Sequence, residues 1–254
     1  MDLGINGKRT LVTGASKGIG LATARRLAAE GASVAICARG EAGLKEAVNA
    51  LSEGGARVHS GSVDVADGDA LRAFVVESAG QLGGLDIVVH NTSASVGRDA
   101  QQWVDSFNLD LMPLVNLVDA AHPFLAASGV GAVVAIGTTN AIETAPPAAA
   151  NSYGALKAAV IQYASALGHT LAPAGIRVNT VSPGPVWFAG SVWEQIKEAR
   201  PELYDSVVAS IPLGSMATDD DIANTVVWLA SPAAGHITGV NLVVDGGFTK
   251  RVQL

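Results

Sequence analysis

Tyr153 and Lys157 are the residues of this chain whose types and spacing most directly suggest proton chemistry. They stand four positions apart, which places a phenol and an ammonium on one face of a helix. A free phenol has a pKa of about 10, and a neighbouring cation favours the phenolate and brings that pKa towards neutrality. The pair is therefore suited to giving a proton to a carbonyl oxygen while a hydride reaches the carbon. The alternative is a surface lysine beside a half-buried tyrosine.

A glycine-rich turn, Thr13 to Gly20, is the second candidate for chemistry. Its glycines, Gly14, Gly18 and Gly20, tolerate positive φ and let the backbone approach a pyrophosphate. The turn follows a short apolar segment and opens a helical pattern, whose N-terminus offers free N–H groups and a positive dipole end. We predict a dinucleotide site here, with an ordinary strand-to-helix turn as the alternative.

The choice between NAD and NADP depends on the end of the second apolar segment. Dinucleotide folds often place an acid there to hold the ribose 2′-hydroxyl, but this chain has Ala38-Arg39. A guanidinium can clamp a 2′-phosphate bidentately, and Lys17 in the phosphate turn can approach the same group. The sequence therefore favours NADP(H), with NAD(H) as the alternative if Arg39 and Lys17 are only solvated surface residues.

Short apolar segments alternate with longer helical patterns, which predicts parallel strands joined by crossover helices. We expect an α/β fold: a single-domain, Rossmann-type, doubly wound parallel sheet of about seven strands, with helices on both faces, over residues 1–254. The stretch 183–212 has the weakest periodicity, and we expect a substrate lid near residues 185–212. The expected strands are 10–12, 33–37, 57–63, 86–89, 132–136, 177–181 and 241–244, and the expected helices are 21–29, 40–51, 70–79, 102–127 and 152–171.

Composition excludes several classes of protein. The formal charge of −7 argues against nucleic-acid binding, which needs basic patches. The one cysteine, Cys37, lies in an apolar segment and is expected in the core rather than as a nucleophile. The five histidines lack ligand spacing, and Asp219 to Asp221 precede a helical pattern, so we expect no metal site. With no basic-apolar leader and no long apolar span, a cytoplasmic protein without membrane contact is expected.

With the phosphate turn and the Tyr/Lys pair together, the chain resembles the classical short-chain dehydrogenase/reductase family over roughly residues 6 to 250. The resemblance implies an NAD(P)-dependent oxidoreductase that reduces a ketone or 3-oxoacyl-like carbonyl to a secondary alcohol, or the reverse. The matching segments are Thr13 to Gly20, Asp64-Val65, His90-Asn91-Thr92-Ser93, Asn108, Tyr153 with Lys157, Pro183-Gly184, Gly239-Val240-Asn241 and Asp245-Gly246-Gly247.

The resemblance also assigns roles to individual residues. It implies that Tyr153 is the general acid or base, that Lys157 lowers its pKa and binds the nicotinamide ribose hydroxyls, and that Asn108 helps to relay the proton to solvent. Asp64-Val65 would meet the adenine, and Pro183-Gly184 would lie beside the nicotinamide. The full set of implied cofactor contacts is Gly14, Ser16, Lys17, Gly18, Ile19, Gly20, Arg39, Asp64, Val65, Asn91, Tyr153, Lys157, Pro183, Gly184 and Val186.

The chain departs from the family pattern at the serine that usually bonds the substrate oxygen. The corresponding stretch, after the fifth strand, contains Thr138, Thr139 and Asn140 but no serine. Thr138 aligns if two residues near Pro146-Pro147 are inserted before Tyr153, whereas Asn140 takes the usual spacing without them. A threonine hydroxyl can make the same hydrogen bond as a serine.

Two further departures concern cofactor contacts. His90 and Ser93 change the loop on the adenosine side. Phe188 stands where the family has a threonine that bonds the carboxamide, which leaves the backbone of Val186 for that contact.

Two other functions remain as alternatives. One is an NAD-dependent alcohol dehydrogenase, and the other is a nucleotide-binding homologue with little catalysis, which the missing serine motivates. For an enzyme the partner is a small-molecule carbonyl or alcohol, and for the homologue with little catalysis it is the nucleotide alone. The resemblance also implies a homo-tetramer (or dimer), packed through the two long helices and the closing strand. The low share of charged residues, 15%, is consistent with such packing.

Overall fold

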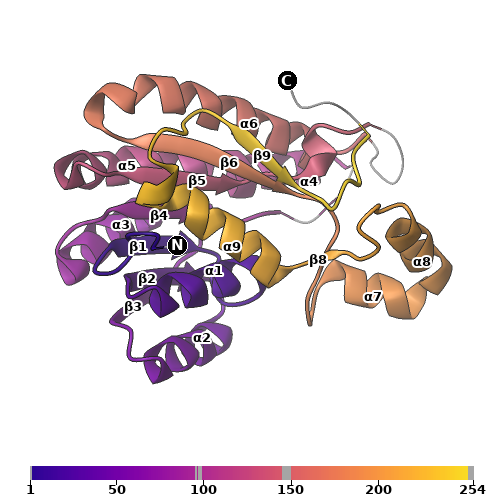
Figure 1. Cartoon of the computed structure of the whole chain (residues 1–254), viewed down its shortest axis with the longest axis horizontal. Coiled ribbons are helices and arrows are strands. Elements are labelled where there is room, and N and C mark those ends of the chain that lie inside the picture. The colour runs from indigo at the N-terminus through magenta and orange to yellow at the C-terminus, as the bar shows by residue number, and fades with distance from the viewer. Residues whose placement is uncertain (1, 95, 97–98, 145–149, 251–254) are drawn as a thin grey trace.

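A parallel sheet of seven strands forms the centre of the molecule (Figure 1). The computed structural model describes residues 2–94, 96, 99–144 and 150–250. The strand order is β3-β2-β1-β4-β5-β6-β9, and every neighbouring pair is parallel, which confirms the predicted doubly wound sheet. The strands are β1 (Arg9–Thr13), β2 (Ser33–Ala38), β3 (Val58–Ser62), β4 (Ile87–His90), β5 (Ala132–Ile136), β6 (Arg177–Pro183) and β9 (Asn241–Val244).

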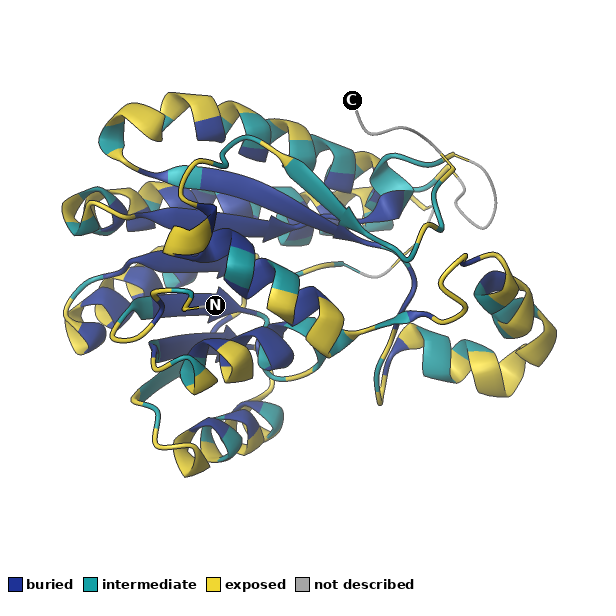
Figure 2. Ribbon diagram, in the orientation of Figure 1, coloured by how far each residue is buried: buried dark blue, intermediate teal, exposed yellow. Residues whose placement is uncertain are grey.

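Helices cover both faces of this sheet, as predicted. α1, α2 and α9 contribute to the core on one face, and α3, α5 and α6 to the core on the other. Because both faces are covered, β5 is apolar at every position rather than alternating, and all of it is buried (Figure 2). The bounds are α1 (Gly18–Ala29), α2 (Glu41–Glu53), α3 (Gly68–Leu82), α5 (Met112–Ser128), α6 (Ser152–Thr170) and α9 (Asp219–Ala230).

The strand order reverses between β1 and β4, which lie side by side at the centre of the sheet. In open α/β sheets, ligands bind outside the carboxyl ends of the strands at such a reversal, because the connections leave in opposite directions and open a crevice. The glycine-rich turn follows β1, and the segment from Asn91 to Ser93 follows β4. The fold therefore brings these two segments to the same crevice.

The long helical segment predicted near residues 102–127 is confirmed, but a π-helical turn divides it. α4 (Ala100–Ser106) passes into a π-helical turn, η1 (Phe107–Leu111), before α5 begins. Pro113 near the start of α5 has no N–H, so the carbonyl of Leu109 cannot take part in a regular α-helical hydrogen bond. It accepts instead from the hydroxyl of Thr92, at 3.2 Å. Such π-helical turns are frequent at functional sites.

The chain after β6 extends beyond the carboxyl ends of the strands and carries two short helices that project from the sheet (Figure 1). This part contains β7 (Val186–Trp187), α7 (Val192–Ala199) and α8 (Pro201–Ala209), and it returns through β8 (Ala217–Thr218), which pairs with β7. Its small core is separate from the two main cores and consists of Val207, Ile211 and Met216. The expected lid segment thus has an internal structure of its own.

Candidate active site

Helix α6 carries both members of the Tyr/Lys pair, and its first turn is fixed in two ways. Asn151 caps the helix, and its side chain accepts the N–H of Gly154 at 2.8 Å. Gly154 also packs against the backbone after β5, since a Cβ at this position would lie 2.8 Å from the carbonyl oxygen of Asn140. This close approach places Tyr153 beside the end of β5.

Thr138 is the residue of this segment that contacts the phenol. The side-chain hydroxyls of Thr138 and Ser93 both act on the phenol of Tyr153 and lower its pKa. Thr138 is buried, and its hydroxyl also accepts the N–H of Asn140 at 3.3 Å. Of the three candidates for the missing serine, the geometry therefore favours Thr138. The insertion expected near Pro146-Pro147 lies outside the described residues.

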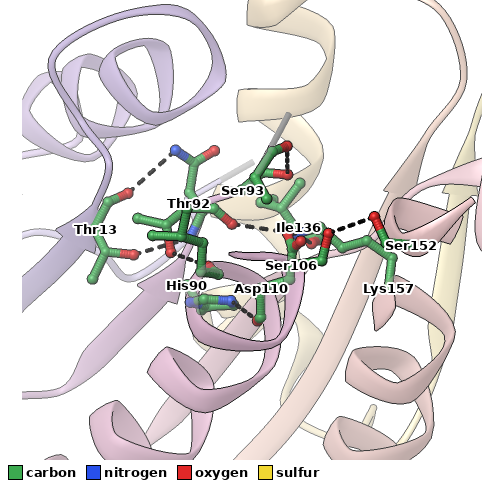
Figure 3. A network of polar contacts seen from close by, with 12 residues as sticks. Thr13, His90, Thr92, Ser93, Ser106, Asp110, Ile136, Ser152 and Lys157 are labelled. Carbon is green, nitrogen blue, oxygen red and sulfur yellow. Dashed lines mark hydrogen bonds and ion pairs between the residues drawn. The ribbon is translucent and has the colours of Figure 1, made fainter. Parts of the chain in front are cut away.

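Lys157 is buried at the centre of a polar network (Figure 3). Its Nζ donates to the carbonyl oxygen of Ile136 at 2.9 Å and to that of Thr92 at 3.3 Å. Nζ also lies 3.2 Å from Oδ1 of Asp110. An ammonium has three N–H donors, so these three partners can engage all of them.

Asp110 is the residue of this site that the sequence reasoning missed. It lies on the η1 turn, and its side chain is fully buried against Lys157. Asn108, the predicted relay residue on the same turn, is half-buried, and no described residue donates to or accepts from its side chain. The role of Asn108 therefore stays a prediction. A signal was present, because Asp110 stands four and seven positions before the core residues Leu114 and Leu117, at the spacing of one helix face.

The Tyr153 phenol does not show the lowered pKa that its lysine neighbour suggested. Burial raises the pKa of Tyr153, the hydrogen bond from Thr138 lowers it, and the negative charge of Asp110 raises it further. Burial lowers the pKa of Lys157, which the nearby carboxylate of Asp110 opposes. The phenol therefore faces a paired lysine, not a free cation.

His90 closes the network on the side of β4. Its Nε2 donates to the carbonyl oxygen of Asp110 at 2.8 Å, which fixes the η1 turn against the sheet. Burial and the nearby charge of Lys157 lower the pKa of His90 to about 3, so the ring is neutral at physiological pH. Asn91 next to it donates from Nδ2 to the carbonyl oxygens of Thr13 and Gly14, at 3.2 and 3.0 Å.

The glycine-rich turn has the shape of a phosphate cradle. Gly14 and Gly18 have φ of +64° and +53°, which only glycine adopts readily. A Cβ on Gly20 would lie 2.5 Å from the carbonyl oxygen of Gly14, so this position also requires glycine. No side chain caps the first turn of α1, whose N-cap is Lys17. Free N–H groups at a helix start are donors for an anion, so the turn fits a dinucleotide pyrophosphate.

A cavity of about 220 Å³ continues from this turn towards β2 and β3. The predicted contacts that line it are Gly14, Ser16, Lys17, Arg39, Val65 and Asn91. Asp64 is exposed, and its carboxylate accepts the N–H of Ala66 at 3.1 Å. Ile19 packs against the core beside α1. Most of the predicted adenosine-side residues thus meet around one space.

The other end of the turn is covered by an aromatic ring. A Cβ on Gly18 would lie 2.6 Å from Cζ of Phe188, so the ring rests on the glycine. Val186, two residues earlier, is buried in β7. Pro183 ends β6, and Gly184 after it packs against Asp245, where a Cβ would lie 2.7 Å from the Cβ of that residue. Phe188 thus brings the segment that follows β7 against the phosphate turn, whereas the nicotinamide contacts of Pro183, Gly184 and Val186 stay a prediction.

Two other predictions concern reactive side chains. Cys37 is fully buried in β2, and burial raises the pKa of its thiol to about 12, which confirms a core residue. Among the described residues, no three His, Cys, Asp or Glu side chains gather as a metal site. Over the same part of the chain, no helix combines the length and apolar character needed to cross a bilayer.

Known proteins resemble this chain over nearly its full length. The family described as Enoyl-(Acyl carrier protein) reductase matches residues 14–249. Isoepoxydon dehydrogenase patN of Penicillium expansum is 37% identical, with 97% of this chain and 96% of that protein covered. The 3-oxoacyl-[acyl-carrier-protein] reductase FabG of Staphylococcus aureus (strain Mu50 / ATCC 700699) is 35% identical, with 94% and 97% covered.

Solved structures agree with these relatives. L-Sorbose reductase from Gluconobacter frateurii, complexed with NADPH and L-sorbose, has a TM-score of 0.89 at 30% identity, covering 99% of this chain and 100% of that one. NAD⁺-bound xylitol dehydrogenase has a TM-score of 0.89 at 25% identity, covering 96% and 99%. This chain therefore belongs to the classical short-chain dehydrogenase/reductase family and is an oxidoreductase that interconverts carbonyl and alcohol groups.

Proposed function

We propose that this protein reduces a ketone or 3-oxoacyl-like carbonyl of a small molecule to a secondary alcohol, with NADPH as the preferred cofactor and Tyr153 as the acid. The observation that carries the proposal is the position of the phenol. The hydroxyls of Thr138 and Ser93 act on it and lower its pKa, and it lies one helical turn from the buried ammonium of Lys157. The crevice that holds these groups also contains the glycine cradle after β1.

In the proposed reaction, bound NADPH supplies the hydride to the carbonyl carbon. Tyr153 gives its phenolic proton to the carbonyl oxygen, so that one C–H and one O–H bond form and the phenol becomes a phenolate. Thr138 donates a hydrogen bond to the same oxygen, which stabilises the charge that develops there. The phenolate then takes a proton from water, and alcohol oxidation follows the same steps in reverse.

In this proposal, Nζ of Lys157 also binds a ribose hydroxyl of the cofactor. The longest of its three contacts is the one to the carbonyl of Thr92, at 3.3 Å. A ribose hydroxyl would replace that contact at the smallest cost. The shorter bond to Ile136 and the ion pair with Asp110 would continue to hold the ammonium.

The preference for NADP(H) is supported by two cations at one cavity. Lys17 and Arg39 both line the space beside the phosphate turn. The acid expected of an NAD enzyme at the end of β2 is absent, since β2 ends in Ala38 and Arg39 follows. The similar sorbose reductase carries NADPH, whereas the xylitol dehydrogenase carries NAD⁺, so the cofactor is tested directly. Equal kcat/KM with NADH and NADPH would contradict the preference.

The substrate would be enclosed by the segment from residue 185 to 212. Its helices, α7 and α8, follow β7 in the chain, and their small core includes apolar and aromatic side chains. A panel of ketones, sugars and β-ketoacyl thioesters tests the substrate class. Tyr153→Phe tests the acid, because the phenyl ring keeps the packing but has no proton to give. Undiminished turnover in that variant would refute the assignment.

Self-association as a tetramer or dimer is also proposed. Trp103, Val104 and Phe107 are all exposed on α4 and the turn that follows it, where a second copy could cover them. Exposed apolar patches of this kind often mark interfaces. Light scattering tests the proposal, and a monomer at micromolar concentration would contradict it.

A further inference from the structure

The buried carboxylate of Asp110 lies beside the Tyr153 and Lys157 pair, and the proposed reaction assigns it no role. Asp110 is fully buried, and its Oδ1 lies 3.2 Å from Nζ of Lys157, which is also buried. Apart from this ion pair, no described residue hydrogen-bonds the carboxylate. Removing a charged side chain from water is costly, and a buried ion whose partner is removed becomes strongly destabilising. Asp110 and Lys157 therefore form one unit, in which removal of either charge leaves the other buried without its partner.

Three separate parts of the chain hold this unit in place. Lys157 is bonded by the end of β5 through Ile136 and by the segment after β4 through Thr92. Asp110 is held by the η1 turn, whose backbone accepts a hydrogen bond from His90 on β4 (Figure 3). The position of the carboxylate is thus set by the interruption between α4 and α5, not by a mobile surface loop.

The elements packed around Tyr153 contribute both charged and neutral groups. Helix α6 contributes Lys157 and η1 contributes Asp110, while His90 from β4 is neutral. Thr138 and Ser93 contribute hydroxyl groups without charge. Among the described residues, the negative charge of Asp110 raises the pKa of Tyr153, and the ammonium of Lys157, one helical turn from the phenol, carries the opposite charge.

We propose that Asp110 is a positioning residue that fixes the ammonium of Lys157 and cancels its charge beside Tyr153. A phenol next to a cancelled pair keeps its proton to a higher pH than a phenol next to a free cation. The enzyme is thereby biased towards the form that donates a proton, which is the form that carbonyl reduction needs. This inference rests on the proposed role of Tyr153 as the acid.

Asp110→Asn tests the proposal with the smallest change of shape. Asparagine keeps an oxygen that can accept from Lys157 and removes the negative charge. We expect the ionisation midpoint of Tyr153 to fall by about one pH unit, and the acid limb of alcohol oxidation to move to lower pH by the same amount. Oxidation on that limb would then rise about tenfold.

The ionisation of the phenol can be measured without turnover. The chain has three tyrosines, so the near-ultraviolet phenolate signal of Tyr153 is obtained by subtracting the same titration of Tyr153→Phe. Asp119→Asn is the matched control, because Asp119 is exposed on α5 and its charge acts on Tyr163. This control should leave the Tyr153 midpoint unchanged.

One further variant covers the case in which Asp110→Asn does not fold. Asp110→Asn with Lys157→Met removes both charges together, so no buried ion is left unpaired, and it should leave the Tyr153 midpoint close to that of the natural protein. A midpoint displaced by a full pH unit in this double variant, or an unmoved midpoint in folded Asp110→Asn, would overturn the proposal. Turnover retained by Tyr153→Phe would instead refute the catalytic role of the tyrosine, which is a separate failure.

Discussion

Replacing Gly20 with alanine should damage the phosphate cradle and lower stability together. The added Cβ would lie 2.5 Å from the carbonyl oxygen of Gly14 and 3.0 Å from Cα of Ala15, and it would also collide with Nδ2 of Asn91. Two of these three neighbours are backbone atoms, so they cannot rotate away. Asn91 cannot move freely either, because Nδ2 donates to the carbonyl oxygens of Thr13 and Gly14.

The size of the effect follows from these contacts. Overpacking of this kind costs about 1–3 kcal/mol, and the loss of one Asn91 hydrogen bond adds about 1 kcal/mol. Alanine recovers about 1 kcal/mol, because it is the better helix former and Gly20 lies inside α1. A net loss of about 2 kcal/mol corresponds to a fall in Tm of about 4–8 °C for a chain of this size. A displaced turn also loses a charge-assisted bond to the pyrophosphate, so Kd for NADPH should rise at least about tenfold.

Calorimetry and a fluorescence titration with NADPH measure both quantities. Gly80→Ala is the matched control, since Gly80 lies in α3 and a Cβ there has no neighbour within 4 Å. It should leave Kd unchanged and raise Tm slightly, because the helix gains alanine without any collision. If Gly20→Ala bound NADPH as tightly as the natural protein and melted no lower, the account of a tightly packed cradle would be refuted.

Two other predictions concern the candidate site, and a third concerns the ion pair between Arg9 and Asp86. Thr138→Val should lower kcat about tenfold or more while Thr138→Ser retains it, and equal rates in steady-state assays would contradict the substrate hydrogen bond. Arg39→Ala should raise KM for NADPH at least about tenfold and leave KM for NADH unchanged, whereas parallel changes would count against a 2′-phosphate contact. Burial raises the pKa of Asp86, but Arg9, 2.7 Å away, outweighs burial and holds that pKa below its ordinary value. This stabilisation is present above the unfolded-state pKa of about 4 and is lost as pH falls. Asp86→Asn should therefore lower Tm at pH 7 and flatten its fall in acid, and an unchanged acid profile would contradict this reasoning.

The order of strands and helices could be predicted because each element carries its own pattern. β5 is apolar at every position, as a strand covered on both faces must be, and the capping residue Asn151 marks the start of α6. The glycine spacing after β1 likewise depends on local backbone geometry, so it could be read without knowledge of distant contacts. These features are short in range along the chain.

The features that escaped prediction depend on contacts between distant segments. The break before α5 follows from Pro113, but its effect becomes visible only when the hydroxyl of Thr92 donates to the released carbonyl of Leu109. Asp110 was not predicted as a site residue because its partner, Lys157, lies 47 positions away and on another helix. The contact of Phe188 with the phosphate turn likewise depends on where β6 ends in space, which a linear pattern does not record.

The single cysteine has a practical consequence for studying movement. Cys37 is enclosed in β2, and the raised pKa of its thiol leaves almost no thiolate at neutral pH, so it should not react with maleimides in the folded protein. A thiol introduced on the exposed face of α8, for example by Ser206→Cys, would then be the only one open to labelling. A spectroscopic probe attached there would test whether the projecting helices move when cofactor or substrate binds, without any need to remove the native cysteine first.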